Sequence, residues 1–311
     1  MSTLTISATR VPPFARKSFP LTIPFSPDET VEDIKKTIAA KIPKLYTSRQ
    51  RLTLKSEKKP LADETKLKDA GIGSGAELEL KDLGPQIGWK TVFVVEYTGP
   101  LLIHPIFYYL PEIFYGKGPV IHSQLQNFVF AMVELHFAKR VLETLFIHRF
   151  SHGTMPLFNI FKNSFHYHVL SGVLLALDLY RPAFSATSPY IQGTFRNDET
   201  FLWICAGLWA FFELSNLSTH LTLRSLRPAG TKKRAIPFGY GFGMVSCPNY
   251  FFETLGWTVV AGMTGSYAAY FFLVVGTGQM LLWALKKHKN YKKDFGKEYP
   301  RGRKAMFPFL I

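Results

Sequence analysis

Residues 201–227 read FLWICAGLWAFFELSNLSTHLTLRSLR, an apolar stretch long enough to cross a lipid bilayer as a helix. Four polar side chains interrupt its second half: Asn216, His220, Arg224 and Arg227. Their offsets of 0, 4, 8 and 11 residues place them within roughly 80° of one another around a helix axis. Polar groups at membrane depth are costly unless they line a cavity or pair with other charges. The stretch therefore predicts a membrane helix that carries a buried polar site.

A second polar set lies in the hydrophobic window near residues 126–147. It shares one face of the predicted helix and consists of His136, Lys139, Arg140 and Glu143. Glu143 lies one helical turn from Lys139, close enough to orient its ammonium group. Two polar faces in apolar segments indicate that function resides in a polar site inside a membrane protein.

Cationic side chains gather at the end of the first stretch. Arg224 and Arg227 are followed by Lys232, Lys233 and Arg234, which makes five cations in eleven residues. Arginine binds phosphate through bidentate, charge-assisted hydrogen bonds, so the cluster favours a multiply phosphorylated ligand. The alternative is that the arginines only extend to the interface where a membrane helix ends. That alternative does not explain why Asn216 and His220 lie on the same face of the helix among apolar residues.

Aromatic residues divide the chain into two parts. Of the 47 Phe, Trp and Tyr residues in 311, only four lie in residues 1–86. We expect a small soluble domain at residues 1–82 and a lipid-embedded domain at residues 83–311. The two cysteines both lie in the second part, which argues against a disulfide framework and excludes a CxxC metal site.

The first part has the pattern of a small α+β domain. Apolar alternation at residues 3–7 and 19–25 predicts two strands, and Thr30 with Asp33 forms the capping box of a following helix. Further strands are expected at residues 52–54 and 77–81. This order resembles the ubiquitin-like β-grasp fold. Because the chain continues without a free Gly-Gly end, we expect a built-in module.

The second part is expected to be an all-α polytopic membrane domain with six to seven transmembrane helices. The predicted spans lie near residues 87–110, 126–147, 165–180, 201–223, 250–264 and 267–285. Residues 286–304 then carry nine Lys/Arg and two Asp/Glu. A basic run that flanks a span places the C-terminus in the cytosol. No nucleic-acid-binding motif accompanies this charge, so we expect no nucleic-acid partner.

Two short motifs do not carry the chemistry that they superficially resemble. Residues 239–243, GYGFG, lack the preceding strand and the βαβ context of a dinucleotide fingerprint, so we interpret them as a loop. His148 and His152 form an HxxxH pair without the further histidine clusters that a di-iron enzyme needs. We therefore assign no metal.

Residues 246–253, SCPNYFFE, form a third candidate site. Pro248 suits the first turn of a helix, and Asn249, Tyr250 and Glu253 then lie at the mouth of that helix. A tyrosine is common at a membrane interface. An acidic residue one turn further into apolar sequence is not, which favours a functional site.

Several segments together resemble the very-long-chain trans-2-enoyl-CoA reductase family of the steroid 5-alpha-reductase superfamily. They are KRVLETLF at 139–146, HRFSHGTMP at 148–156, LRSLRPAG at 223–230, SCPNY at 246–250, and the closing YP, RKA and FPF motifs within 299–309. The resemblance covers essentially all of residues 87–311. The N-terminal ubiquitin-like module also belongs to this family's layout.

The resemblance implies that trans-2-enoyl-CoA is reduced with NADPH, the last step of fatty-acid elongation in the endoplasmic reticulum membrane. It implies Tyr250 as proton donor, with Lys139 acting directly on the oxyanion or through Tyr250. Other elongation enzymes and membrane lipids would be partners. The superfamily's cofactor residues correspond to Asn216, His220, Arg224, Arg227, Arg234, Asn249, Glu253 and Tyr291, although the steroid branch has Asp where this chain has His220.

Two other functions stay open at this point. One is reduction of a sterol or steroid alkene, which needs the same hydride chemistry in a differently shaped pocket. The other is a membrane-anchored ubiquitin-like adaptor without enzymatic activity. Deletion of residues 1–82 would abolish an adaptor's function, whereas a reductase that still folds would keep its turnover.

Overall fold

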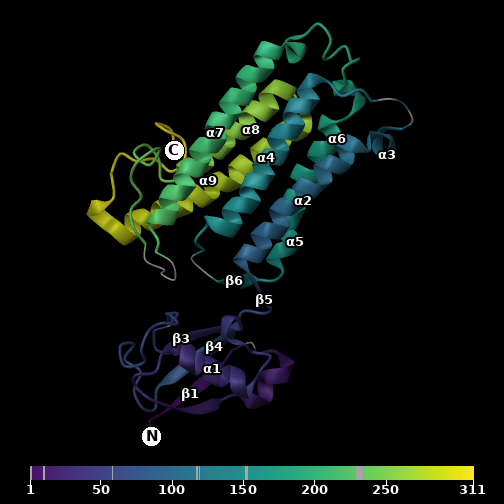
Figure 1. Cartoon of the computed structure of the whole chain (residues 1–311). Helices are drawn as coiled ribbons and strands as arrows, with labels where there is room; N and C mark the ends of the chain where they lie inside the picture. The colour runs from purple at the N-terminus through teal and green to yellow at the C-terminus, as the bar shows by residue number, and fades with distance from the viewer. Residues whose placement is uncertain are drawn as a thin grey trace. The chain divides into compact units, whose positions relative to one another are not determined.

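The computed structural model describes residues 2–9, 11–57, 59–116, 118, 120–150, 153–228 and 234–311 (Figure 1). The chain divides into two compact units. The first comprises Met1–Trp89 with His152–Asn159, and the second comprises Lys90–Ser151 with Ile160–Ile311. Lys232, Lys233 and His152, which sequence analysis singled out, lie outside the described residues.

A four-stranded sheet with one long helix builds the first unit. The strands are β1 (Ser2–Ala8), β2 (Leu21–Phe25), β3 (Gln50–Leu54) and β4 (Glu77–Asp82), in the order β2-β1-β4-β3. β1 and β4 are parallel, and the two outer pairs are antiparallel. This is the predicted β-grasp arrangement. Its core consists of the residues whose alternation predicted the strands, among them Leu4, Ile6 and Ile23, all fully buried.

Helix α1 (Val31–Lys41) begins at the predicted capping box. The Asp33 amide donates to Thr30 Oγ1 at 3.3 Å, and the Thr30 amide donates to Asp33 Oδ2 at 3.0 Å. Ile34 and Ile38 then repeat at helical spacing and are buried against the sheet.

A second, two-stranded sheet completes this unit. β5 (Gln86–Gly88) pairs antiparallel with β6 (Thr154–Pro156), and the Trp89 indole donates to the Thr154 carbonyl at 2.9 Å. Strands of three residues are too short for their periodicity to reveal them, which is why the sequence did not predict this ribbon.

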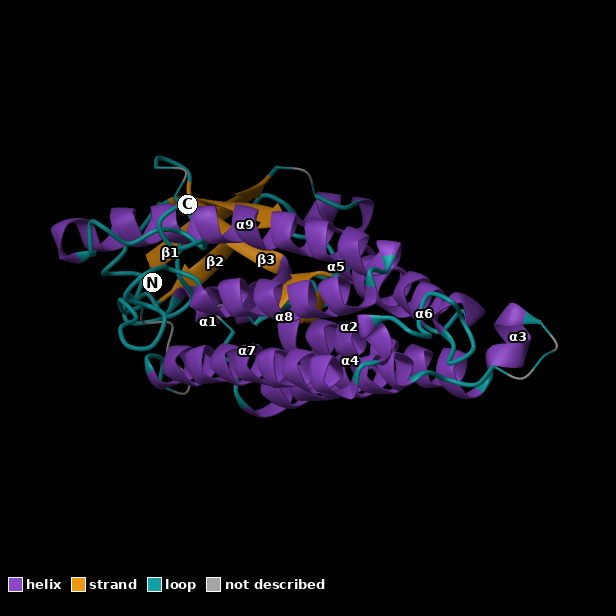
Figure 2. Cartoon of the chain, turned by 90° about the horizontal axis from the view of Figure 1, so that it is seen from above, coloured by secondary structure: helices purple, strands orange, loops and turns teal. Residues whose placement is uncertain are grey.

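Helices make up the second unit, and Figure 2 shows the long ones running side by side. They are α2 (Trp89–Tyr109), α3 (Pro111–Tyr115), α4 (Gln124–Phe146), α5 (Asn159–Ser164), a π-helical segment (Phe165–Leu174), α6 (Leu175–Leu179), α7 (Glu199–Ser225), α8 (Pro248–Thr264) and α9 (Tyr267–Phe295). α8 packs against both α7 and α9, and α4 packs against α7. Each of the six predicted windows contains a helix, but the first one, 87–110, begins with residues 87 and 88 of strand β5.

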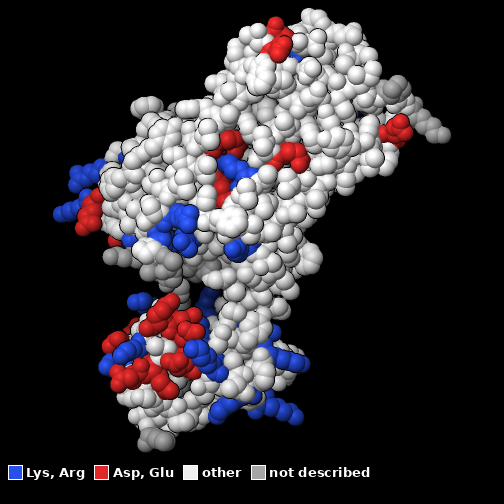
Figure 3. Space-filling model, in the orientation of Figure 1, with Lys and Arg blue, Asp and Glu red and all other residues white. Residues whose placement is uncertain are grey.

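Length and hydropathy single out two candidate membrane spans among the described residues: Glu199–Ser225 and Tyr267–Glu298. The total of six to seven spans stays a prediction. In Figure 3 the helical unit is mostly free of charged atoms on the visible face, except for a small area where both signs meet and for charges toward its ends. An apolar surface with charge confined in this way suits a lipid environment.

An ion pair inside the first unit supports a stability prediction. Arg49 Nε and Nη2 donate to the two Asp82 oxygens at 2.5 and 2.8 Å. Partial burial raises the pKa of the Asp82 carboxyl, but the Arg49 hydrogen bonds, the Gly84 amide and the Arg49 charge together outweigh it, so the pKa lies below the ordinary 3.8. The pair's stabilisation is therefore complete above the pKa of unfolded aspartate and is lost as the pH falls through the lower folded value.

We expect Asp82→Asn to destabilise the first unit by about 1.5–3 kcal/mol near neutral pH, because it removes the charge-assisted pair. Amide hydrogen exchange of β4 should then be faster in the variant than in the wild type. The difference should be constant down to the ordinary aspartate pKa of about 4 and should shrink only below it. A difference that does not shrink below this pH would show that the carboxylate charge is not what stabilises the strand.

Candidate functional site

A cavity of about 290 Å³ lies at the C-terminal end of α7, between this helix, the residues after α4 and the later turns of α9. Its polar and aromatic lining consists of His148, Arg149, Phe150, His220, Arg224, Arg227, Arg234, Lys287, Asn290 and Tyr291. Five of these carry a fixed positive charge, and no Asp or Glu is among the described residues that line the cavity. Such a donor set suits a polyanion.

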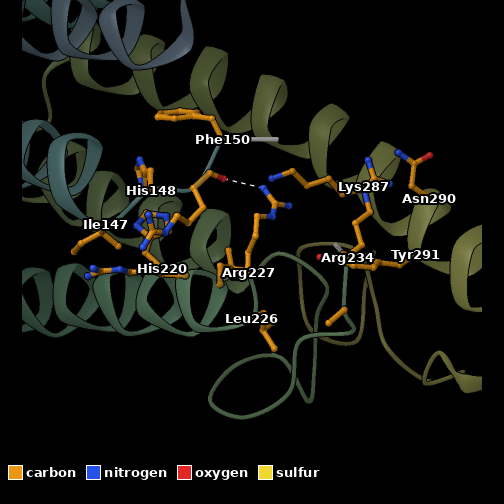
Figure 4. Close-up of a pocket in the computed structure, with 14 residues that line it drawn as sticks. Ile147, His148, Phe150, His220, Leu226, Arg227, Arg234, Lys287, Asn290 and Tyr291 are labelled. Carbon is orange, nitrogen blue, oxygen red and sulfur yellow. Dashed lines mark hydrogen bonds between the residues drawn. The ribbon is translucent and has the colours of Figure 1, made fainter. Parts of the chain in front are cut away.

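Three predicted arginines reach this cavity, and two of them already have protein partners. Arg227 Nη1 donates to the Arg149 carbonyl at 2.8 Å, the dashed line in Figure 4. Arg234 Nη1 pairs with Asp294 at 2.8 Å. Arg224 is exposed and lines the cavity. The cavity thus contains two guanidinium groups that protein partners hold in place, Arg227 and Arg234, and an exposed one, Arg224, that can adapt to a ligand.

Deeper in the bundle, the other predicted cofactor residues form one hydrogen-bonded set. Asn216 Nδ2 donates to the Asn249 carbonyl at 2.8 Å and lies 3.5 Å from Glu253 Oε2. Asn249 Nδ2 lies 3.4 Å from His220 Nε2. Because His220 also lines the cavity, this amide set is continuous with the cationic pocket.

Glu143 is the hub of the buried charges on α4. Its carboxylate accepts from Arg140 at 2.7 Å and lies 3.1 Å from His220 Nδ1 and 3.6 Å from Lys139 Nζ, while its side chain is only 1% exposed. Arg140 Nη2 also donates to the Tyr97 hydroxyl at 2.8 Å. Glu143 and Lys139 are therefore neighbours, as the helical spacing predicted.

A second buried carboxylate, Glu213 of α7, was missed by sequence reasoning. It lies 2.8 Å from Lys139 Nζ and 2.8 Å from His136 Nδ1. The signal was present, because an acidic residue three positions before Asn216 shares its helix face. Glu213 and Glu143 together neutralise the cations that α4 carries into the bundle.

Among the described residues, Tyr250 makes no hydrogen bond to Lys139. Its hydroxyl accepts a hydrogen bond from Lys287 of α9 at 2.8 Å. Tyr291, one turn after Lys287, stacks on Tyr299 with ring centroids 5.5 Å apart. Lys287 was also missed, although its spacing of four residues from Tyr291 places both on one face of α9. Asn290, three residues after Lys287, shares this face of α9, whereas Arg149 lies outside the helices and has no periodic signal.

Glu143, His148 and His220 offer ligand atoms that lie within 4.8 Å of one another. Divalent metals accept such donors. Here, however, the Arg140 guanidinium 2.7 Å from Glu143 and the Lys139 ammonium at 3.6 Å place two positive charges beside the same carboxylate. These charges oppose a further cation, so the absence of a metal site stays our prediction.

Comparison with known proteins is informative for both units. The profile of the family described as 3-oxo-5-alpha-steroid 4-dehydrogenase matches residues 153–311, and that of the TECR ubiquitin-like domain matches residues 24–82. A Schizosaccharomyces pombe protein provisionally named an enoyl reductase is 44% identical over 95% of this chain and 96% of its own length. The very-long-chain enoyl-CoA reductase of Dictyostelium discoideum is 40% identical over 92% of this chain and 93% of its own. A Caenorhabditis elegans protein provisionally given the same name is 42% identical, with 92% of both chains covered.

The chain belongs to the very-long-chain enoyl-CoA reductase family. The family match confirms the ubiquitin-like nature of the first unit. Most of the residues that match the 3-oxo-5-alpha-steroid 4-dehydrogenase profile, 153–311, lie in the helical unit. The roles of individual residues in this family member stay predictions, which the geometry above makes testable.

The Glu143 hub predicts a large stability effect. Glu143→Gln keeps the shape of the side chain but leaves Arg140, Lys139 and His220 without their shared counter-charge. Removing one partner from a buried ion pair costs about 3–5 kcal/mol. We expect a lower thermal unfolding midpoint of the detergent-solubilised protein.

Glu134→Gln is the matched control, because Glu134 lies on the same helix and forms no ion pair with any described residue. It should leave the midpoint nearly unchanged. Equal midpoints for the two variants would mean that Glu143 is not the hub of the charge network.

Proposed function

We propose that this protein reduces very-long-chain trans-2-enoyl-CoA to the saturated acyl-CoA with NADPH, as the last step of a fatty-acid elongation cycle. One observation carries the proposal: a cavity lined by five cations is joined by hydrogen bonds to a buried amide and carboxylate set. Relatives that match nearly the whole chain are named enoyl-CoA reductases. A reductase needs such a polyanion site beside a buried polar reaction site.

The residues present suit a phosphorylated nicotinamide dinucleotide. Ligand pockets usually measure about 300–1,000 Å³, so the cavity of about 290 Å³ would hold part of the molecule. Arg224, Arg227 and Arg234 would bind its phosphates. The surplus of positive charge favours the form that carries the additional 2′-phosphate, which is NADPH. Tyr291 would contribute an aromatic wall.

The inner set would hold the other end of the cofactor. Asn216, Asn249 and Glu253 present amide and carboxylate groups, and His220 links them to the cationic cavity. We therefore assign these four residues to cofactor binding as well. Lys139 and Glu143 support them, because Lys139 Nζ donates to Asn216 Oδ1 at 2.6 Å and Glu143 Oε1 lies 3.1 Å from His220 Nδ1.

When bound, the reduced nicotinamide supplies a hydride to the β-carbon of the enoyl thioester. Negative charge then develops on the thioester oxygen, where a positioned donor stabilises it. We propose Tyr250 as that donor and as the acid that completes the reduction. Lys139, oriented by Glu143, is the second catalytic candidate. Its contact with Asn216 places it on the cofactor side of the site.

We further propose where the protein works. A polytopic membrane domain at residues 83–311 would hold the acyl chain among its helices and face membrane lipids. The basic run after Leu285 would place the C-terminus on the cytosolic face of the endoplasmic reticulum, where CoA and NADPH are available. The ubiquitin-like module at residues 1–82 would remain attached, and other elongation enzymes would supply the substrate.

The match to the 3-oxo-5-alpha-steroid 4-dehydrogenase profile favours a second candidate, reduction of a steroid alkene. NADPH oxidation by the purified protein distinguishes the two. A long-chain trans-2-enoyl-CoA should support turnover, and a 4-ene-3-oxo steroid should not. Turnover with the steroid alone would support the steroid-reducing function instead. A lack of turnover with both substrates would contradict both functions.

Arg227 should act on cofactor affinity. Arg227→Ala removes one charge-assisted phosphate contact, worth about 1.5–3 kcal/mol. We expect the KM for NADPH to rise by roughly 10- to 100-fold, with a smaller change in the KM for enoyl-CoA. Arg301→Ala, at an exposed arginine away from the cavity, is the control. Unchanged NADPH kinetics would mean that the cluster only extends to the interface.

Tyr250 should act on turnover. Tyr250→Phe removes one hydroxyl and keeps the ring packing, so the protein should fold. We expect kcat to fall by about 10²–10³, the scale of losing one oxyanion donor, with little change in NADPH binding. Tyr270→Phe, at an exposed tyrosine of α9, is the matched control. Normal turnover of Tyr250→Phe at saturating substrates would remove Tyr250 from the mechanism.

A further inference from the structure

The hydroxyl of Tyr250 has one hydrogen-bond partner among the described residues, the Lys287 ammonium group at 2.8 Å. This ammonium group also lies 4.6 Å from the centroid of the phenol ring. Trp283, one turn earlier on α9, places its ring 6.3 Å from the same ring. α9 therefore holds both the ring and the hydroxyl of Tyr250.

Lys139, the lysine that sequence reasoning associates with Tyr250, is engaged elsewhere. Its Nζ lies 2.6 Å from Asn216 Oδ1, 2.8 Å from Glu213 Oε2 and 3.3 Å from the Glu213 carbonyl. An ammonium group has three hydrogens to donate. Two of these contacts are hydrogen bonds and the third is an ion pair, and none of the three is made to the Tyr250 hydroxyl.

Lys287 has the opposite situation. Among the described residues, Lys287 donates one hydrogen bond, to the Tyr250 hydroxyl, and forms no ion pair with a carboxylate. It also lines the cationic cavity together with Tyr291 (Figure 4). Its charge is therefore not cancelled by a neighbouring acid, and an anion formed on the Tyr250 oxygen would meet an ammonium group at hydrogen-bond distance.

We infer that Lys287 is the positioning residue that orients the Tyr250 hydroxyl and stabilises the oxygen after it has given up its proton. The inference rests on the proposed role of Tyr250. In that step the Tyr250 O–H bond breaks, the proton forms a C–H bond at the substrate α-carbon, and the electron pair stays on the phenol oxygen. Water then returns a proton. A cation beside this oxygen favours the transfer because it offsets the charge that develops there.

The first experiment compares Lys287→Met, Lys287→Arg and the control Lys289→Met, an exposed lysine of α9 outside the cavity. We expect Lys287→Met to lower kcat by about 10- to 100-fold, with the KM for enoyl-CoA nearly unchanged. Lys287→Arg retains the charge and should recover most of the loss. NADPH affinity, measured by cofactor fluorescence without substrate, should fall much less than in Arg227→Ala, because Lys287 donates to Tyr250 and is one of five cations around the cavity.

A cofactor role would give a different pattern. If Lys287 only binds phosphate, NADPH affinity falls in Lys287→Met while kcat at saturating NADPH is normal. If the Lys287 side chain only extends to the membrane–water interface, all three variants should have the turnover and the NADPH affinity of the wild type. Either result overturns the inference. Fluorescence titration reports on folding as well, because a misfolded variant binds no cofactor.

The second experiment introduces Lys287→Met into Tyr250→Phe. If Lys287 acts through the hydroxyl, it should cause no further loss there. An additive loss would overturn the inference while Tyr250 keeps its role. If Tyr250→Phe alone keeps normal turnover, the proposed acid is wrong, and the inference about Lys287 falls with it. The two failures are therefore distinguishable.

Discussion

The pairing of two buried carboxylates with the cations of α4 is the constraint on which the helical unit depends. An isolated charge inside an apolar bundle is too costly to keep, so each must meet a partner with good geometry. Glu143 of α4 and Glu213 of α7 meet this need by contacting Lys139 from two sides. Because Glu213 of α7 pairs with Lys139 and His136 of α4, it constrains how these two helices lie along each other.

This pairing also separates two kinds of positive charge. Inside the bundle, every cation of α4 has a carboxylate within reach, so the interior set is close to neutral and rigid. At the end of α7, the cavity holds five cations without a lining carboxylate among the described residues. The surplus therefore lies where α7 ends, and a polyanionic ligand would supply the missing negative charge. The neutral, rigid charge set inside the bundle and the surplus of cations in the cavity together favour specific binding of a polyanionic ligand.

Sequence periodicity predicts which residues share a helix face, and the structure shows which features of the site this predicts and which it does not. The stripe from Asn216 to Arg227 and the face from His136 to Glu143 are both present as predicted. Periodicity does not reveal which neighbouring helix each face meets. Pairing of Tyr250 with Lys287, and of Lys139 with Glu213, depends on helix packing that one sequence does not specify. The β-grasp unit was predictable in more detail because its alternation and its capping box are local signals.

The first turn of α8 joins the two halves of the site. Consecutive residues of a helix point about 100° apart, so Asn249 and Tyr250 face different neighbours. Asn249 contacts Asn216 and His220 of α7, whereas Tyr250 contacts Lys287 of α9. The start of this helix is fixed by Gly241, whose φ of 76° suits glycine and where an added Cβ would lie 2.6 Å from Pro248. A substitution at Gly241 would therefore move the cofactor side and the proposed acid together, because both depend on where this one helix begins.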